Sequence, residues 1–155
     1  MISFETEREI WLWLACIIDT ECSLGLYKRK AGNRKIKRGF AWAPDLRCSS
    51  TTPVLLQQLI AICKGGSISD CNFVEKRKKQ KQFHLSSNGL RRILPKVLPH
   101  LLVKRKQAEL VLEALSLLHK GNNQWTGKPC NDERLEEIYQ ELRRLNQRGV
   151  KIISK

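Results

Sequence analysis

The sequence has no long apolar run, which excludes a chain built around membrane-spanning helices. Its longest uninterrupted apolar stretch, from Ile10 to Ile18, is far shorter than the roughly 20 residues that a helix needs to cross a bilayer. No charged leader with a small-residue cleavage site precedes this stretch, so a secretory signal is not expected either. We expect a soluble intracellular protein, in the cytoplasm of a prokaryote or in an organelle, that is not secreted and has no membrane partner.

Paired cysteines are also missing. No CxxC pair is present, which argues against a zinc site, and the scattered positions do not suggest a disulfide framework. Several cysteines fall inside apolar periodic segments, where a thiol behaves as a small hydrophobic side chain. We therefore favour structural thiols over metal ligands or disulfides. The six residues are Cys16, Cys22, Cys48, Cys63, Cys71 and Cys130.

Acidic residues are scarce in the middle of the chain. Between Cys22 and Lys106 there are 20 Lys and Arg residues and only three acids, whereas the remainder holds nine basic and 12 acidic residues. The net charge of +14 therefore comes entirely from the middle. A solvated basic face kept for solubility would usually be interspersed with acids, so the one-sided field favours a polyanion. Nucleic acid is the expected partner, and an anionic membrane surface is the alternative.

Hydrophobic periodicity predicts an α+β chain in which helices alternate with two hairpins. Within the first hairpin, Pro44 should mark a bulge or an edge because proline cannot donate to a ladder. Both hairpin tips, "KRKAGNRKIKRG" and "VEKRKKQK", are strongly basic. One domain over 1–155 is expected, with its core at about 7–120 and a helical extension at about 130–148. The predicted elements are a helix from Glu7 to Glu21, a hairpin from Ser23 to Cys48, a helix over 53–64 capped by Thr51 or Thr52, a hairpin over 67–87, a helix over 90–98, a long helix from Leu101 to His119 and a last helix from Asp132 to Gln147.

Two charged residues end apolar stripes that should face the core. At 100° per residue, Glu21 continues the stripe of the first helix, and Lys104 stands at one end of the stripe on the long helix. One interpretation is an internal or helix-end salt bridge. The other is metal-assisted phosphodiester hydrolysis, which needs oxygen ligands for a hard cation and a positive group near the scissile phosphate.

The segment "LACIIDTEC", Leu14 to Cys22, resembles the helix that names the LAGLIDADG homing endonucleases, with Glu21 at the last acidic position. The αββαββα order with an additional C-terminal helix agrees with this family, as does a glycine pair before the second hairpin. The segment "LPHLLVKRKQAELVL" is similar to the one that holds the catalytic-site lysine in single-motif members. The resemblance implies a saddle-shaped antiparallel sheet. The matching residues of the helix are Leu14, Ala15, Ile18 and Asp19.

This resemblance implies a homodimeric, site-specific endonuclease that cuts both strands of a long, pseudo-palindromic DNA target and is encoded within an intron. Only one motif helix is present, which favours the dimer over a single-chain enzyme. Glu21 and the carbonyl of Thr20 would hold Mg²⁺ or Mn²⁺, and Lys104 would lie near the scissile phosphate. The helices of two copies would pack through Trp13, Cys16, Ile17 and Thr20.

One stretch departs from the family pattern. Related dimeric enzymes have a Gln and an Arg after the second strand that order catalytic waters, but this chain has "CSSTTP" there. Ser49 or Ser50 is our candidate to hold a water instead. This departure keeps open a non-catalytic DNA-binding regulator on the same fold. A maturase-like protein that binds intron RNA is the other alternative, and the retained acid at Glu21 argues against it.

Strand parity predicts which side chains would face DNA. Arg29 and Arg47 are the best candidates for guanine contacts in the major groove, and the lysines of the tips should contact phosphates. For His84, a merely exposed strand histidine is an equally good interpretation. The predicted DNA-binding residues are Tyr27, Arg29, Lys37, Asp45, Arg47, Ser69, Cys71, Lys76, Lys78, Gln82 and His84.

Overall fold

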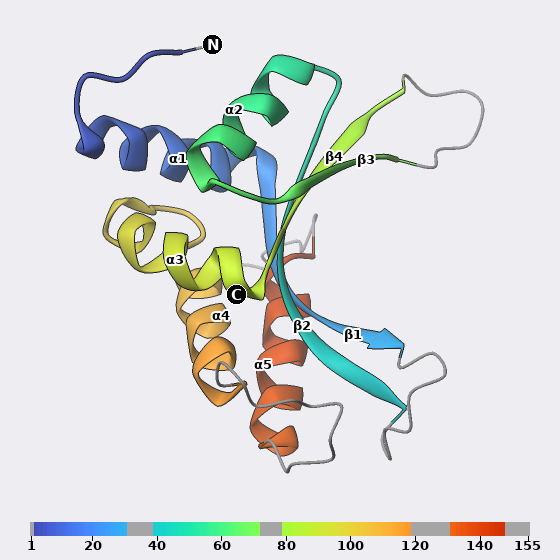
Figure 1. Ribbon diagram of the computed structural model, residues 1–155. Helices are drawn as coiled ribbons and strands as arrows, with labels where there is room; N and C mark the ends of the chain where they lie inside the picture. The colour runs from blue at the N-terminus through green and yellow to red at the C-terminus, as the bar shows by residue number, and fades with distance from the viewer. Residues whose placement is uncertain (1, 31–38, 72–78, 119–130, 148–155) are drawn as a thin grey trace, which may run out of the picture.

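The elements of the chain follow the predicted αββαββα order, with two further helices after it (Figure 1). The computed structural model describes residues 2–30, 39–71, 79–118 and 131–147. The elements are α1 (Glu7–Glu21), β1 (Cys22–Lys30), β2 (Phe40–Ser50), α2 (Pro53–Cys63), β3 (Ser67–Asp70), β4 (Lys81–Ser86), α3 (Ser87–Val97), a 3-10 turn (Leu98–His100), α4 (Arg105–Leu117) and α5 (Asp132–Leu145).

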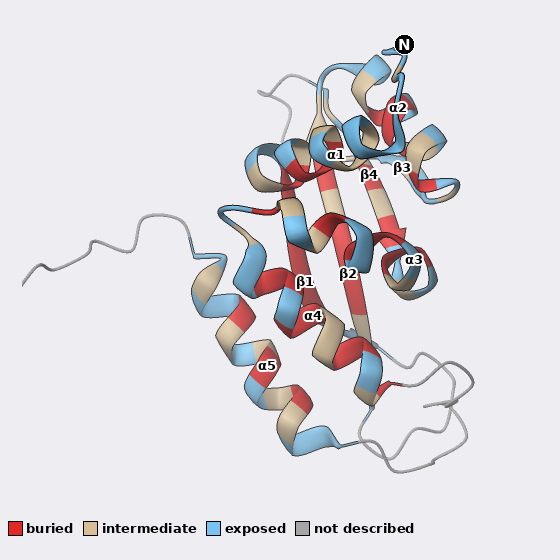
Figure 2. Ribbon diagram, turned by 90° about the vertical axis from the view of Figure 1, so that its left-hand side faces the viewer, coloured by how far each residue is buried: buried red, intermediate tan, exposed pale blue. Residues whose placement is uncertain are grey.

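The four strands form one antiparallel sheet in the order β1-β2-β4-β3. The helices gather on one side of it, as the two views show, and the ends of both hairpins bend away from them (Figures 1 and 2). In the described part of the chain the other side of the sheet carries no helix, and we name this side the open face. The predicted α+β fold with a saddle-shaped sheet is confirmed.

Residues of β1 and β2 alternate between the core and the open face. The pairing runs without interruption from Cys22 opposite Cys48 to Lys30 opposite Phe40, so the bulge predicted at Pro44 is wrong. The predicted edge is correct on one side, because the pairing of β2 with β4 ends at Asp45. The carbonyl of Pro44 points to this unpaired side, where it accepts a hydrogen bond from the Ser87 hydroxyl.

A continuous hydrophobic core lies between the sheet and the helices and includes residues of α5. Three cysteines are buried within it, as the apolar pattern predicted: Cys22, Cys48 and Cys63. Burial raises the pKa of the Cys63 thiol to about 12, so this thiol is an unreactive core side chain. None of the helices in the described ranges has the length and apolar character required to span a membrane.

Several helix ends differ from the prediction. The long helix begins at Arg105 instead of Leu101, because residues 102–104 form a bend that presents their backbone N–H groups to Asp19, and the first helical hydrogen bond is accepted by Lys104. The last helix ends at Leu145, two residues early. Thr52 occupies the predicted N-cap position of α2 without a side-chain capping hydrogen bond, and Lys64 follows the helix in the left-handed region, at φ 48°. The helix predicted over 90–98 begins three residues earlier, at Ser87.

Candidate nucleic-acid interface and active site

Lys104 closes the C-terminal end of α1. Its Nζ donates to the backbone carbonyls of Ile18 at 2.8 Å, Asp19 at 2.9 Å and Cys22 at 2.6 Å. The last carbonyls of a helix have no partner within the helix and carry its negative dipole end, so an ammonium group there is stabilising. The prediction that Lys104 lies within the long helix is wrong: it is the residue before α4. The structure nevertheless brings it next to Glu21, as the two apolar stripes indicated.

Asp19 holds the same junction from the other direction. Its carboxylate accepts the backbone N–H groups of Leu102 at 2.8 Å, Val103 at 3.2 Å and Lys104 at 2.8 Å. Partial burial acts to raise the pKa of Asp19, but the three backbone donors outweigh it and hold the pKa below its ordinary value. Asp19 and Lys104 therefore lock the end of α1 against the start of α4. Asp19 was identified from the sequence only as a match to the family motif, and no role in the site was predicted for it.

Glu21 remains exposed at this locked end. Within the described residues its carboxylate makes no hydrogen bond or ion pair, and no cluster of three metal-ligating side chains occurs there. The interpretation that Glu21 and Lys104 form a salt bridge is thus not what the structure shows. Thr20, the neighbouring residue, is exposed as well, and its hydroxyl donates to the carbonyl of Cys16 at 2.8 Å. The carbonyls taken by Lys104 do not include that of Thr20.

Ser49 and Ser50 follow directly after the pair of Cys22 and Cys48, so β2 carries them to the same end of α1. The Ser49 hydroxyl accepts the side-chain amide of Gln82 at 3.0 Å, across the pair that β2 and β4 form there. The Ser50 hydroxyl accepts the backbone N–H of Thr52 at 3.0 Å. Each hydroxyl keeps its own hydrogen for a further acceptor.

The predicted DNA-facing side chains share the open face where the structure describes them. The register places Arg47 opposite His84, and Ser49, Gln82 and Ser69 in a row across three strands. Arg29 is exposed near the end of β1. Cys71 lies just beyond β3, where its N–H bonds to the carbonyl of Gln80. Lys37, Lys76 and Lys78 lie outside the described residues.

Asp45 is the exception among these residues. It lies on the open face, but its side chain is only 1% exposed, so it is not available as a direct DNA contact. Its Oδ2 accepts from Arg47 Nε at 2.8 Å and lies 2.6 Å from His84 Nε2. Parity gave the correct side of the sheet, but it could not show that these two neighbours cover the carboxylate.

The exposed face of α1 contains the residues predicted for helix pairing. Cys16 and Thr20 are exposed, and Trp13 and Ile17 are half-buried beside them. Leu12 extends this face and is 44% exposed. Leu102 and Val103, in the segment that Asp19 holds, are 88% and 72% exposed. A strip of apolar surface therefore runs along α1 to the end that carries Glu21.

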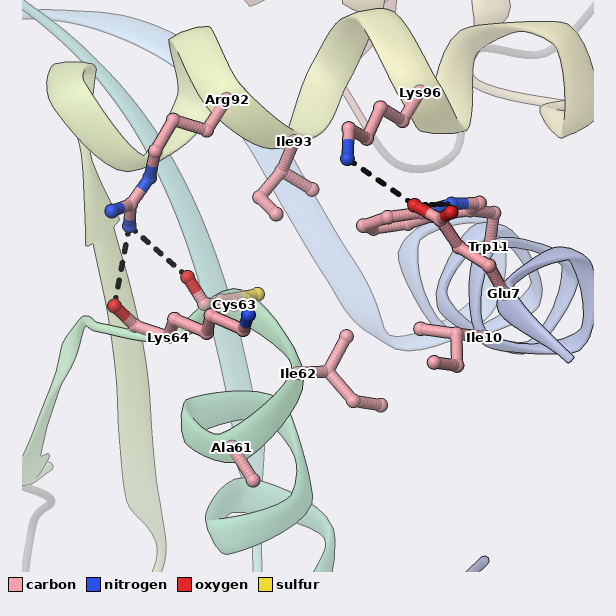
Figure 3. A pocket seen from close by; sticks show the side chains of 10 residues that line it. All are labelled: Glu7, Ile10, Trp11, Ala61, Ile62, Cys63, Lys64, Arg92, Ile93 and Lys96. Carbon is pink, nitrogen blue, oxygen red and sulfur yellow. Dashed lines mark hydrogen bonds and ion pairs between the residues drawn. The ribbon is translucent and has the colours of Figure 1, made fainter. Parts of the chain in front are cut away.

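A large cavity, of about 690 Å³, lies between α1, α2 and α3 at the opposite end of α1 (Figure 3). Three of its four charged side chains, those of Glu7, Arg92 and Lys96, already have partners within the protein. Glu7 pairs with Lys96 at 3.3 Å, and Arg92 donates to the carbonyls of Cys63 and Lys64 at 3.1 and 3.3 Å. We therefore place the candidate site at the C-terminal end of α1 and on the open face, not in this cavity.

Solved structures share this fold. Homing endonuclease I-CvuI, in complex with a DNA target in the presence of Mg, superposes with a TM-score of 0.70 at 20% identity, over 93% of this chain and 85% of that chain. Group I intron-encoded homing endonuclease I-CeuI, complexed with DNA, gives 0.67 at 17% identity, over 97% and 73%. The I-SmaMI LAGLIDADG homing endonuclease, bound to cleaved DNA, gives 0.65 at 17% identity, over 97% of this chain and 47% of that one. No family model and no curated protein matches the sequence. The chain thus has the LAGLIDADG homing endonuclease fold.

Proposed function

We propose that this chain is a site-specific double-strand DNA endonuclease of the homing type, encoded within an intron, that acts as a homodimer with Mg²⁺ or Mn²⁺ on a long, pseudo-palindromic target. The observation that carries this proposal is the end of α1. An exposed carboxylate with no partner in the described part of the chain, Glu21, stands there beside a fixed ammonium group, Lys104, where the open face begins. The DNA complexes of I-CvuI, I-CeuI and I-SmaMI, which have the same fold, support it.

The ligand set of one chain suits a shared metal site. Glu21 and the Thr20 carbonyl offer two oxygen ligands, the type that hard divalent cations prefer, and such cations keep several waters in addition. We propose that two copies bring their Glu21 carboxylates together. A cation bound there would stabilise negative charge on the scissile phosphate and increase the acidity of an attacking water.

Lys104 is proposed to act through its charge and its position. All three hydrogens of the ammonium group can be used by the three carbonyls of α1 and Cys22, so the group need not donate to a phosphate to be effective. Its positive charge stays at the end of α1, where it favours the developing charge of the phosphodiester. Ser49 and Ser50 are the proposed holders of an ordered water, through the hydroxyl hydrogens that their known contacts leave available.

The exposed strip on α1 supports the homodimer. We propose that Trp13, Cys16, Ile17 and Thr20 meet the same residues of a second copy about a two-fold axis. Small side chains at Cys16 and Thr20 allow two helices to approach closely, and Leu12 and Leu102 would be covered at the margins of the contact.

Cleavage of a randomised double-stranded DNA library tests the enzyme directly. With Mg²⁺ the wild type should cut both strands at one sequence, and EDTA should abolish cutting. Glu21→Gln should bind the recovered site with unchanged affinity and cut it at least 100-fold more slowly, because it loses the charged metal ligand. Glu109→Gln is the matched control, since Glu109 is an exposed helical glutamate without contacts in the described residues, and it should cut normally.

The same assay separates the alternatives. Selective DNA binding without cutting, under any divalent metal, would mean a regulator in which the departure at Cys48 to Pro53 has cost the chemistry. Preference for a structured intron RNA over every duplex would mean a maturase-like protein. Either result contradicts the proposed nuclease.

A further inference from the structure

One buried carboxylate ties together the two central strands of the open face. Asp45 Oδ2 accepts a hydrogen bond from Arg47 Nε on its own strand, β2, and lies 2.6 Å from His84 Nε2 on the neighbouring β4. Arg47 and His84 are directly opposite each other in the register. Both contacts converge on Oδ2, while Oδ1 is buried without a hydrogen-bond partner among the described residues. Because a buried carboxylate is costly unless its neighbours satisfy it, the arrangement favours one fixed position for Arg47 and His84 around this oxygen.

A tyrosine from β1 supports Arg47 from another side. The guanidinium carbon lies 4.0 Å from the centre of the Tyr27 ring, a stacking distance. Tyr27 can reach back over the strand because its neighbour on the same face is Gly25: a Cβ there would lie 2.8 Å from three atoms of the tyrosine side chain. Gly25 in turn is the residue opposite Asp45. Three strands thus contribute to the setting of a single arginine.

Although Arg47 is held in this way, the two terminal nitrogens of its guanidinium group remain available to a ligand. Asp45 occupies Nε, while the two terminal nitrogens make no hydrogen bond to the rest of the described chain. The Arg47 side chain is 35% exposed, although the carboxylate below it is sealed. Two parallel N–H donors match O6 and N7 of guanine in the major groove, the commonest specific contact between a protein side chain and a base. Phosphate contacts, in contrast, tolerate flexible side chains and carry no sequence information.

We propose that Asp45 is a positioning residue which, with Tyr27, fixes Arg47 to read one guanine in each half of the target. This inference rests on the proposed DNA binding and adds to it the residue that sets specificity at that base pair. Asp45 itself does not touch DNA. The fixed position of Arg47 gives a structural reason for the predicted guanine contact. Asp45, which was predicted to contact DNA, instead holds Arg47 in place.

The test measures base preference position by position. The recovered target is synthesised with each of the four base pairs at every position, and binding is measured with Ca²⁺ in place of Mg²⁺. In Asp45→Asn, the preference for guanine at one position of each half-site should fall about 10-fold, while preferences elsewhere stay within about twofold. Asp70→Asn removes an exposed carboxylate from β3 and is the matched control, with no change at that position.

Arg47→Lys keeps the charge but removes the fork, and it is the second variant should Asp45→Asn fold poorly. It should lose the same guanine preference while the preferences at the other positions stay within about twofold. Equal weakening at all positions in Asp45→Asn, or an unchanged base preference in Arg47→Lys with only a smaller salt dependence, would overturn the inference and assign Arg47 to a phosphate. A wild type that selects a site without such a guanine overturns this inference alone, whereas one that selects no site at all contradicts the proposed function as well.

Discussion

At the scale of single residues, Asp19 and Lys104 decide where two helices end and begin. Asp19 receives three backbone N–H groups from the segment before α4, and Lys104 donates to three carbonyls at the end of α1. The contacts are reciprocal, so each residue satisfies backbone groups that would otherwise lack partners. Glu21 and Leu102 are both positioned by this exchange.

Asp19→Asn should lower the free energy of unfolding by about 2 kcal/mol at neutral pH, because a neutral amide accepts fewer of the three backbone donors and accepts them more weakly. The hydrogen bonds to the charged form lower the pKa of Asp19, so its stabilisation is complete above about pH 4 and is lost as the pH falls through the depressed value. Urea unfolding of both proteins between pH 7 and pH 2 checks this. The difference between them should shrink below pH 4, and a constant difference would contradict the assigned role.

Residues that end a pattern were harder to predict than residues that continue one. The buried stripe of α1, with Leu14, Ala15 and Ile18, follows from its period. The contacts of Lys104 join positions 82 or more residues apart in the sequence. The burial of Asp45 depends on which neighbouring side chains cover it on the sheet face. Spacing along a single element contains no information about either.

At the scale of elements, α5 is fastened to the back of the first hairpin. Lys28 is on the core side of β1, and its Nζ lies 2.6 Å from Glu136 Oε2. The same Nζ lies about 5 Å from the ring centres of Phe40, Trp42 and Tyr139. The Trp42 indole also donates to Asp132 at 2.8 Å, at the first turn of α5. The hairpin that carries Arg29 and Arg47 on its open face is therefore supported from behind.

Lys28→Met should destabilise the protein by about 1–2 kcal/mol, since it removes both the cation–π contacts and the ion pair to α5. DNA affinity at a temperature well below unfolding should change little. Arg29→Met is the matched control one residue along: it should leave the melting temperature unchanged and weaken DNA binding. Thermal melting and a DNA-binding titration of the two variants check both expectations. If Lys28→Met weakened DNA binding and Arg29→Met lowered the melting temperature, the two faces of β1 would be assigned the wrong way round.

Element types were predicted correctly wherever a period was long, and the errors are at ends set by tertiary contacts. The start of α4 shifted because residues 102–104 form a bend that Asp19 holds through their backbone N–H groups. Pro44 caused no bulge because β4 stops before it, which leaves a strand position where no N–H is required. The proline is visible in the sequence, but the residue at which the neighbouring strand ends could not be predicted from it.

At the scale of the whole molecule, the open face of the sheet and the exposed strip on α1 are both left uncovered by the described part of the chain. Cys16 gives a direct test of whether the exposed strip on α1 packs against a second copy of the chain. If two α1 helices pack about a two-fold axis, their Cys16 thiols should come within reach of a short bis-maleimide linker, and cross-linked dimers should form at micromolar protein concentration.

Since Cys71 is partly exposed and Cys130 lies outside the described residues, the experiment is done in a Cys71→Ser, Cys130→Ser background. Cys16→Ser is its control and should abolish the product. A monomer by sedimentation, even with the DNA target present, would contradict the proposed dimer and with it the shared metal site.

The shared oxygen of Asp45 also has a consequence for altering the target sequence, whether by natural drift or by engineering. Because Arg47 and His84 share this carboxylate and Tyr27 stacks on Arg47, a change at any of them disturbs the others. Libraries that randomise these positions one at a time should yield mostly weakened proteins, and new specificities should appear only when 27, 45, 47 and 84 vary together.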